Sequence, residues 1–247
     1  MILELDLGNT RGKWRIVDRQ GVLQISGTGS VDEWIGGDMP VAWSGIKRVR
    51  AGSVLSSAKN AALADRLQTL LQLRVEFAVA TASCAGVRNA YADPGRLGVD
   101  RWLALIAAYR SQQAAVLVID AGSALTVDAV NADGNHLGGY IVPGARLMER
   151  ALLNGTDRVR FENGTADGFD LGADTGGCVH NGIAAAQCGT MLVALGVVEA
   201  RLGYRPALII SGGWSELAQK YLAKLGVANV IMAPDLVLDG LRWVLPE

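Results

Sequence analysis

The feature that most constrains the fold is a pattern of strand, aspartate, tight turn and returning strand that occurs twice in the chain. In the first copy, an apolar run that begins at Ile2 ends at Asp6, and a glycine and a hydroxyl residue follow. In the second copy, residues 116–119 lead into Asp120, and Leu125 opens the return. Each copy predicts a β-hairpin with glycine at a position where backbone must approach a neighbour closely.

The spacing of the two copies indicates a duplication. Asp6 and Asp120 are 114 positions apart in a chain of 247 residues. After each hairpin the sequence predicts a third strand, a helix, another strand and another helix. The chain is therefore expected to hold two α/β domains with a duplicated βββαβα order, residues 1–112 and residues 113–247. Each would be a mixed sheet flanked by helices, with a cleft between the copies.

Local signals place the elements around the hairpins. Ser30 is expected to cap a short helix over residues 31–35. Residues 154–175 are polar, glycine-rich and poorly periodic, which predicts a long functional loop or lid. Residues 181–202 predict a helix of small side chains, suited to close packing within the chain or across a dimer. A last helix over residues 235–244 falls in the second domain by sequence order.

Composition excludes several classes of protein. Half of the residues are apolar and the mean hydropathy is +0.25, which indicates a folded chain and not a disordered one. The net charge is −1 and the longest basic cluster spans only residues 47–50, which argues against a nucleic-acid binder. The acidic start does not resemble a signal peptide, and no apolar run is expected to reach about 18 residues. These observations predict a cytoplasmic protein with no membrane segment.

The three cysteines offer one alternative, a metal site. Cys178, His180 and Cys188 lie near one another in sequence, but their spacing matches no common zinc pattern and a fourth ligand is missing. We expect buried or incidental cysteines instead.

The glycine-rich strand ends favour phosphate binding without one of the common phosphate-binding motifs. The sequence has no Walker motif, no dinucleotide-binding G-x-G-x-x-G after a strand and no G-x-S-x-G elbow. Two strand-end carboxylates facing one cleft suit Mg²⁺, which bridges phosphate oxygens. Backbone N–H groups at residues 8–10 and 122–123 are placed to hold phosphates. Gly212 and Gly213 leave room for a flat adenine. This combination indicates phosphoryl transfer.

Residues 98–101 open an alanine-rich helix with an acid and a base side by side. The helix dipole by itself explains Asp100, because a negative charge is favourable at a helix N-terminus. It does not explain Arg101, because a positive charge is unfavourable there. In a phosphoryl transfer, Asp100 would accept the proton of the acceptor hydroxyl and Arg101 would bind an anionic acceptor.

Together the motifs resemble type III pantothenate kinases. The residues that carry the resemblance are D-x-G-N-T at 6–10, G-V-D-R at 98–101, D-A-G-S-A-L-T at 120–126, G-G-Y-I-V-P-G at 138–144 and S-G-G at 211–213. The resemblance runs nearly from end to end. It implies two RNase H-like domains of the actin-like ATPase fold, as in the acetate kinase/Hsp70/actin superfamily.

The resemblance also implies an activity: ATP-dependent phosphorylation of pantothenate to 4'-phosphopantothenate, the first step of coenzyme A biosynthesis, by a homodimer. Asp100 would be the general base. The implied ATP-binding residues are Asp6, Gly8, Asn9, Thr10, Lys13 and Ser123, in addition to Gly212 and Gly213. The implied pantothenate-binding residues are Tyr91, Gly98, Val99, Arg101 and Thr175. Asp120 would hold a monovalent cation, potassium or ammonium, and Asp6 would meet Mg²⁺ through phosphate or water.

Departures from the family pattern leave some points open. Ser123 and Leu125 stand where the family commonly has threonine, and Leu125 is expected in the core. Residues 154–161 match the family poorly, so the role of the lid is undetermined. Two other functions remain: a kinase of the same superfamily acting on a sugar, acylate or polyphosphate, and a nucleotide-binding accessory factor in transcription. Asp100 and Arg101 beside Tyr91 favour an acceptor that carries both a hydroxyl and a carboxylate.

Overall fold

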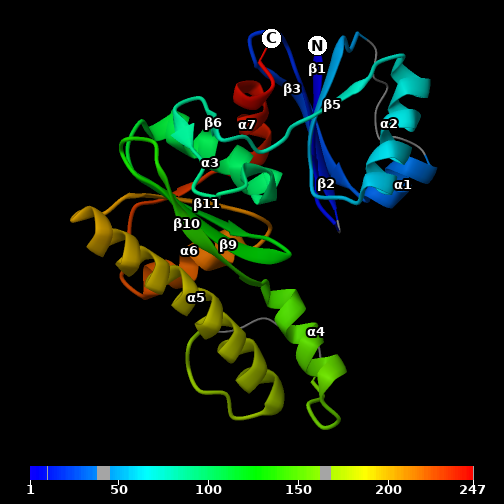
Figure 1. Cartoon of the computed structure of the whole chain (residues 1–247). Helices are drawn as coiled ribbons and strands as arrows, with labels where there is room; N and C mark the ends of the chain where they lie inside the picture. The colour runs from blue at the N-terminus through cyan, green and yellow to red at the C-terminus, as the bar shows by residue number, and fades with distance from the viewer. Residues whose placement is uncertain (10, 38–44, 162–167, 247) are drawn as a thin grey trace. The chain divides into compact units, whose positions relative to one another are not determined.

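The chain folds into two compact units, each with its own five-stranded sheet (Figure 1). The computed structural model describes residues 1–9, 11–37, 45–161 and 168–246. Unit 1 comprises Met1–Arg110 and Asp235–Glu247, and unit 2 comprises Ser111–Pro234.

Unit 1 is built on a mixed sheet with the strand order β3-β2-β1-β4-β5. Its strands are β1 (Ile2–Leu7), β2 (Gly12–Val17), β3 (Leu23–Gly29), β4 (Arg48–Ser53) and β5 (Val75–Phe77). The first three form an antiparallel meander, while β4 runs parallel to β1 and β5 runs parallel to β4. Its helices are α1 (Val31–Gly36), α2 (Ser57–Leu71), α3 (Val99–Gln112) and α7 (Leu236–Val244). A short hairpin, β6 (Ser83–Cys84) and β7 (Val87–Arg88), and a 3₁₀ turn, Pro94–Arg96, precede α3.

The alternation of side chains in β1 divides the two faces of this sheet. Leu3, Leu5 and Leu7 join the buried cluster formed with α1 and α2. Glu4 and Asp6 point to the opposite face, which α7 covers through contacts with β1 and β4. Ser30 caps α1 by accepting a hydrogen bond from the Glu33 N–H, which confirms the predicted cap.

Unit 2 repeats the topology of unit 1, with the strand order β10-β9-β8-β11-β12. Its strands are β8 (Val116–Ala121), β9 (Ala124–Val130), β10 (His136–Pro143), β11 (Ala207–Ser211) and β12 (Val230–Met232). The meander and the two parallel strands recur in the same order. The helices are α4 (Ala145–Gly155), α5 (Thr175–Leu202) and α6 (Ser215–Lys224). The predicted duplication is therefore confirmed at the level of the two sheets.

The core of unit 2 lies between its sheet and helices α5 and α6. Leu125 is fully buried there beside Val127, as the sequence predicts for a position that departs from the family pattern. Helix α5 contributes Met191 and Leu195, and α6 contributes Leu222. These contacts pack the hairpin β8–β9 against α5 and α6.

Helix α5 begins earlier than the sequence predicts, at Thr175 and not near residue 181. The reason is a local cap: the Asp174 carboxylate accepts a hydrogen bond of 2.8 Å from the Gly177 N–H. In the sequence, Asp174 directly before T-G-G was the signal for this helix start. Part of the predicted lid, residues 162–167, lies outside the described residues.

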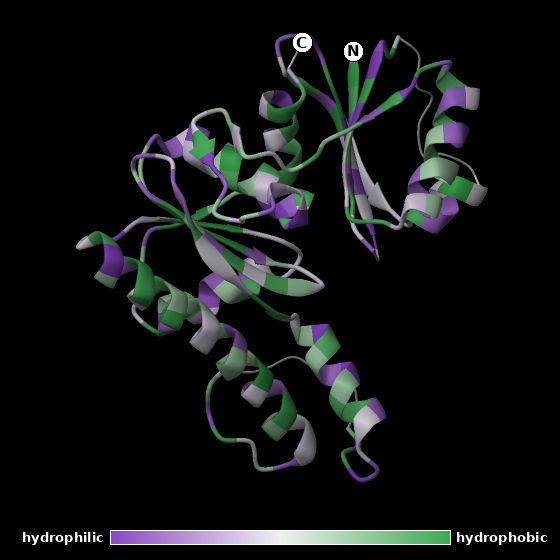
Figure 2. Ribbon diagram, viewed as in Figure 1, coloured by the Kyte–Doolittle hydropathy of each residue, from purple (hydrophilic) through white to green (hydrophobic). Residues whose placement is uncertain are grey.

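Among the described residues, one helix is long and apolar enough to cross a membrane by length and composition, namely α5. This differs from the expectation that no segment reaches such a length. Figure 2 shows the helix mainly in green and pale colours. In its most apolar window 44% of the residues are buried in the protein. Its buried positions recur every three or four residues, which is the pattern of a helix packed on a sheet.

The last helix, α7, groups with unit 1, although sequence order places it in the second domain. Two hydrogen bonds tie it there: the Arg50 guanidinium donates to the Leu245 carbonyl, and the Arg15 guanidinium donates to the Asp239 carboxylate. Gly240 also lies directly against the backbone of Leu103 in α3, where a side chain would overlap it. Long-range polar pairing and a close glycine contact thus decide the placement of this helix.

Candidate active site

In unit 1, the carboxyl end of β1 brings Asp6 next to Lys13. The two residues are direct partners in the antiparallel pairing of β1 with β2, and Gly52 of β4 flanks Asp6 on the other side. The turn between β1 and β2 is tight: the Gly8 N–H donates to the Arg11 carbonyl over 3.2 Å. A carboxylate and an ammonium group therefore lie at one strand end, next to a tight turn.

Two further predicted phosphate contacts, Asn9 and Thr10, belong to this turn. Asn9 is exposed between the two strands. Thr10 lies outside the described residues. Neither position is tested by the geometry, and both remain predictions.

In unit 2, the corresponding strand end surrounds Asp120 with glycine backbone. Gly212 has a φ of +93°, and a side chain there would overlap the Asp120 carboxylate. Gly122 lies on another side, with its Cβ position 3.3 Å from Asp120 Oδ1. The Gly144 N–H donates to the Ser123 carbonyl over 3.0 Å, which holds the β8–β9 turn against the start of α4. Three glycines thus make the space that the carboxylate and the turn occupy.

The donor atoms at both strand ends suit hard cations. Asp6 and Asp120 offer carboxylate oxygens, and the carbonyl oxygens of Gly122 and Ser123 lie together against Gly144. Magnesium and alkali cations prefer such oxygen ligands. Within the described part of the chain no three His, Cys, Asp or Glu side chains form a metal-binding group. The residues present therefore fit a cation that takes most of its ligands from substrate, water or backbone.

A second group in unit 1 lies at the start of α3. Asp100 Oδ1 accepts a hydrogen bond of 2.8 Å from the Arg101 N–H. The carboxylate folds back over Gly98, where an added Cβ would lie 2.7 Å from Asp100 Oδ1. Glycine at this position thus leaves the space that the carboxylate fills. Val99 is the first residue of the helix.

Arg101 is buried, with 7% of its surface exposed. Its Nη1 donates to the Tyr91 hydroxyl over 3.0 Å, and its Cζ lies 5.8 Å from the centre of the Tyr91 ring. Tyr91 is held in turn by Asn89, whose Oδ1 accepts from the Tyr91 N–H over 3.0 Å. A positive charge in the first turn of a helix is unfavourable to the helix dipole. The contacts with Tyr91 stabilise Arg101 in this position.

The structure brings the predicted residues together in groups. Asp6 and Lys13 form one group, residues 98–101 with Tyr91 a second, and Asp120 with Ser123 and Gly212 a third. Gly213 follows Gly212 at the end of β11, and a Cβ there would meet nothing within 4 Å. Thr175 is exposed in the first turn of α5, in unit 2.

Cys178 and His180 each have a partner within unit 2. Cys178 Sγ donates to the Gly172 carbonyl over 3.1 Å and is exposed, whereas Cys188 is buried. Burial raises the pKa of the Cys188 thiol to about 11. His180 Nε2 lies 3.5 Å from Glu149 Oε1.

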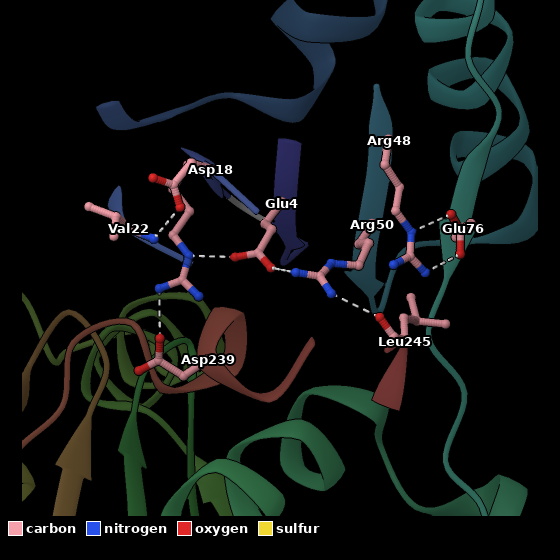
Figure 3. A network of polar contacts seen from close by, with 9 residues as sticks. Glu4, Asp18, Val22, Arg48, Arg50, Glu76, Asp239 and Leu245 are labelled. Carbon is pink, nitrogen blue, oxygen red and sulfur yellow. Dashed lines mark hydrogen bonds and ion pairs between the residues drawn. The ribbon is translucent and has the colours of Figure 1, made fainter. Parts of the chain in front are cut away.

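Sequence reasoning missed a charge network on the face of the unit 1 sheet that α7 covers (Figure 3). Glu4, 1% exposed, accepts from Arg50 over 2.5 Å and from Arg15 over 2.6 Å. Arg15 also donates to Asp239 over 2.6 Å. Burial acts to lower the pKa of Arg15, but the Glu4 and Asp239 carboxylates outweigh it and raise that pKa. The available signal was the alternation I-L-E-L-D-L, which puts Glu4 on the same face as Asp6.

Fold and strand-end chemistry define the class of protein. Two mixed five-stranded sheets of one topology, each with a carboxylate at the end of its first strand, are the RNase H-like halves of the actin-like ATPase fold. A solved putative 2-dehydro-3-deoxygalactonokinase from Sinorhizobium meliloti shares this fold, with a TM-score of 0.61, 11% identity and full coverage of both chains. A putative Baf family transcriptional activator from Campylobacter jejuni matches with a TM-score of 0.58 and 18% identity, over 97% of this chain and 95% of the other.

Sequence comparison gives the family. The family model for type III pantothenate kinase matches residues 2–194. A type III pantothenate kinase of Ectopseudomonas mendocina is 38% identical over 252 aligned residues, covering 100% of this chain and 99% of the relative. The chain therefore belongs to the type III pantothenate kinase family and is a phosphotransferase.

Proposed function

We propose that the chain transfers the γ-phosphoryl group of ATP to pantothenate, giving 4'-phosphopantothenate, with Asp100 as the general base. In this step the pantothenate hydroxyl oxygen bonds to the γ-phosphorus and the bond from that phosphorus to ADP breaks. The hydroxyl proton passes to the Asp100 carboxylate. The protein's part is to position the two substrates and to remove the proton.

The observation that carries this proposal is the arrangement at residues 98–101. A carboxylate that fills the space over Gly98 stands next in sequence to Arg101, whose buried guanidinium meets the Tyr91 hydroxyl. A buried guanidinium is a strong partner for a carboxylate. Pantothenate carries both a hydroxyl and a carboxylate, so one substrate can place its hydroxyl at Asp100 and its carboxylate at Arg101. Gly98 and Val99 would contact it, and Thr175 would close the site.

On the ATP side, Asp6, Gly8, Asn9, Thr10 and Lys13 would hold the phosphates. The support is the pairing of Asp6 with Lys13 at a tight turn. Ser123 would contact ATP, and Gly212 and Gly213 would receive the adenine. Magnesium bound with ATP would neutralise phosphate charge, and Asp6 would face it through phosphate or water.

Asp120 would hold a monovalent cation, potassium or ammonium. The support is its carboxylate in a space lined by Gly122 and Gly212. Bound there, the cation would supply fixed positive charge near the phosphates.

The exposed face of α5 supports a homodimer. Between residues 182 and 200 that face exposes only uncharged residues, and exposed Arg201 ends the run. The exposed positions in this stretch are Gly182, Ala185, Ala186, Val193, Gly196, Val197 and Ala200. A Cβ on Gly182 or Gly196 would meet nothing within 4 Å, so a partner helix can approach closely. Val193→Glu is expected to yield monomers by light scattering. A dimer of unchanged mass would remove this face from the interface.

A cytoplasmic location is supported by the cysteines. All three are free thiols in the structure, as expected of a reducing compartment.

An ADP-release assay with pantothenate and Mg-ATP, run in potassium and again in sodium, tests the function. Turnover is expected to require pantothenate and to fall in sodium. Asp100→Asn is expected to lower kcat by ~10²-fold or more while ATP binding stays nearly intact. Asp93→Asn is the matched control, because Asp93 caps the nearby 3₁₀ turn and asparagine can keep that hydrogen bond.

Arg101→Ala is expected to raise the KM for pantothenate chiefly, with exposed Arg96→Ala as its control. An unchanged KM would show that Arg101 does not bind the acid. Wild-type turnover in Asp100→Asn would remove that residue as the base. If pantothenate gives no turnover in either salt with folded protein, the same assay with sugars, acylates and polyphosphate decides whether another acceptor is used.

A further inference from the structure

Two acids of α7 face two cations of β2 in matched order. Asp239 pairs with Arg15, and Asp235, at the helix start, lies 3.9 Å from Lys13, measured from Oδ1 to Nζ. Four residues along a helix advance about 6 Å, and two residues along a strand advance about 6.7 Å. The helix and the strand can therefore make both pairs at once, which indicates a fitted arrangement and not a chance encounter of surface charges.

The two pairs differ in strength. The Arg15 pair is short, at 2.6 Å, and Arg15 is also held by buried Glu4. The Lys13 pair lies at the outer limit of an ion pair, and its side chains are 33% and 40% exposed. Exposed pairs of this kind contribute little stability. Asp235 therefore holds Lys13 loosely enough for a competing anion to take it.

A second observation shows that the Asp235 carboxylate is not occupied with its own helix. Asp235 is the N-cap residue of α7, a position where aspartate ordinarily accepts a hydrogen bond from the second or third N–H of the helix. In the described part of the chain its side chain makes no such cap. The N-cap φ and ψ of −109° and 24° also lie outside the extended region usual for capping.

We propose that Asp235 is a positioning residue, a built-in counter-ion that holds Lys13 beside the phosphate turn and yields it to the phosphates of ATP. This rests on the proposed contact of Lys13 with ATP. When the phosphates take the lysine, the Asp235 carboxylate becomes available to cap α7. Nucleotide binding at the β1–β2 turn is thereby coupled to the stability of the C-terminal helix. Asp235 directly follows Pro234, the last residue of unit 2, so this coupling acts where the chain returns to unit 1.

The test is a titration of the protein with a non-hydrolysable ATP analogue and Mg²⁺ by calorimetry. Asp235→Asn removes the competing charge and keeps a good N-cap residue. It is expected to tighten Kd by roughly two- to five-fold, the range of exposed ion pairs, and less so at high salt. Asp239→Asn is the matched control: it makes the same charge change on the same helix, away from Lys13, and is expected to leave Kd unchanged.

Two more variants, Lys13→Ala and Lys13→Ala combined with Asp235→Asn, distinguish the role of Asp235 from the proposed contact of Lys13 with ATP. Lys13→Ala is expected to weaken the analogue, and adding Asp235→Asn to it is expected to change nothing further. An effect of Asp235→Asn that persists without Lys13, or one that Asp239→Asn reproduces, would show a general repulsion and overturn the proposal. Wild-type affinity in Lys13→Ala would instead remove Lys13 from the ATP site.

Hydrogen exchange on the unaltered protein gives a readout that needs no variant. The amides of Val237 and Leu238, second and third in α7, are expected to exchange more slowly once the analogue is bound. Unchanged exchange at these two amides, at a saturating concentration of analogue, would contradict the release of Asp235.

Discussion

Gly98→Ala probes the position of the proposed base without touching its chemistry. A Cβ at residue 98 would lie 2.7 Å from Asp100 Oδ1, whereas ordinary contacts begin at 3.4 Å. The carboxylate must therefore retreat by at least about 0.7 Å, which also strains its hydrogen bond to the Arg101 N–H. The overlapped atom is the end of a side chain, so the fold can relieve the overlap cheaply.

The expected result is a stable protein with a poor rate. Misplacing a catalytic group by about 1 Å can cost ~10²-fold, so a shift of this size is expected to lower kcat by roughly ten- to a hundred-fold. Stability should change little, because alanine in place of glycine gains about 0.4–1 kcal/mol from the unfolded chain and offsets the displacement.

The assay is steady-state kinetics with pantothenate and Mg-ATP, together with a thermal melt. Gly95→Ala is the control from the same loop, since its Cβ would meet Asp93 Oδ1 at an ordinary 3.5 Å. In an Asp100→Asn background, Gly98→Ala should add little, because the base is already lost. Full kcat in Gly98→Ala, or a rise in the KM for pantothenate alone, would refute the reasoning from the position of the carboxylate.

Three further predictions concern groups outside the site. Glu4→Gln leaves buried Arg50 without its carboxylate and takes one of two carboxylates from half-buried Arg15, and it is expected to cost about 3–5 kcal/mol in urea unfolding; an unchanged midpoint would contradict this. The hydrogen bonds from Arg48, at 2.7 Å, lower the pKa of Glu76 from its ordinary 4.5. That stabilisation is present above pH 4.5 and is lost as pH falls through the lowered pKa. Glu76→Gln should therefore cost at most about 1 kcal/mol at pH 7 for this half-exposed pair, with the difference vanishing in acid. A thiol reagent at pH 8 should label Cys178 well before Cys188, as peptide mass spectrometry would show, because burial raises the pKa of Cys188; equal labelling would contradict the burial.

Local pattern was a good guide wherever neighbours in sequence are neighbours in space. The two hairpins follow from apolar alternation interrupted at Asp6 and Asp120, and the structure pairs both strands as expected. The helix after Ser30 follows from its cap. Residues 98–101 are contiguous, so the sequence could group the proposed base with Arg101.

The pattern was a poor guide where a glycine or a cap acts through contacts that composition does not reveal. Helix α5 starts about six residues before the predicted position, because Asp174 caps it ahead of a glycine pair that by composition predicts a loop. The role of Gly212 as the space for the Asp120 carboxylate could not be inferred either, since the two residues meet only through the parallel pairing of β11 with β8.

The sequence by itself determined the two hairpins, the order of strands in each half and the residues offered to a phosphate-transfer site. Only the tertiary structure decided that α7 returns to the first sheet and that Asp235 stands against Lys13. The physical reason is range. Periodicity records which side of an element is buried, but Arg15 and Asp239 are 224 positions apart, and no local pattern encodes which distant carboxylate will meet the Arg15 guanidinium.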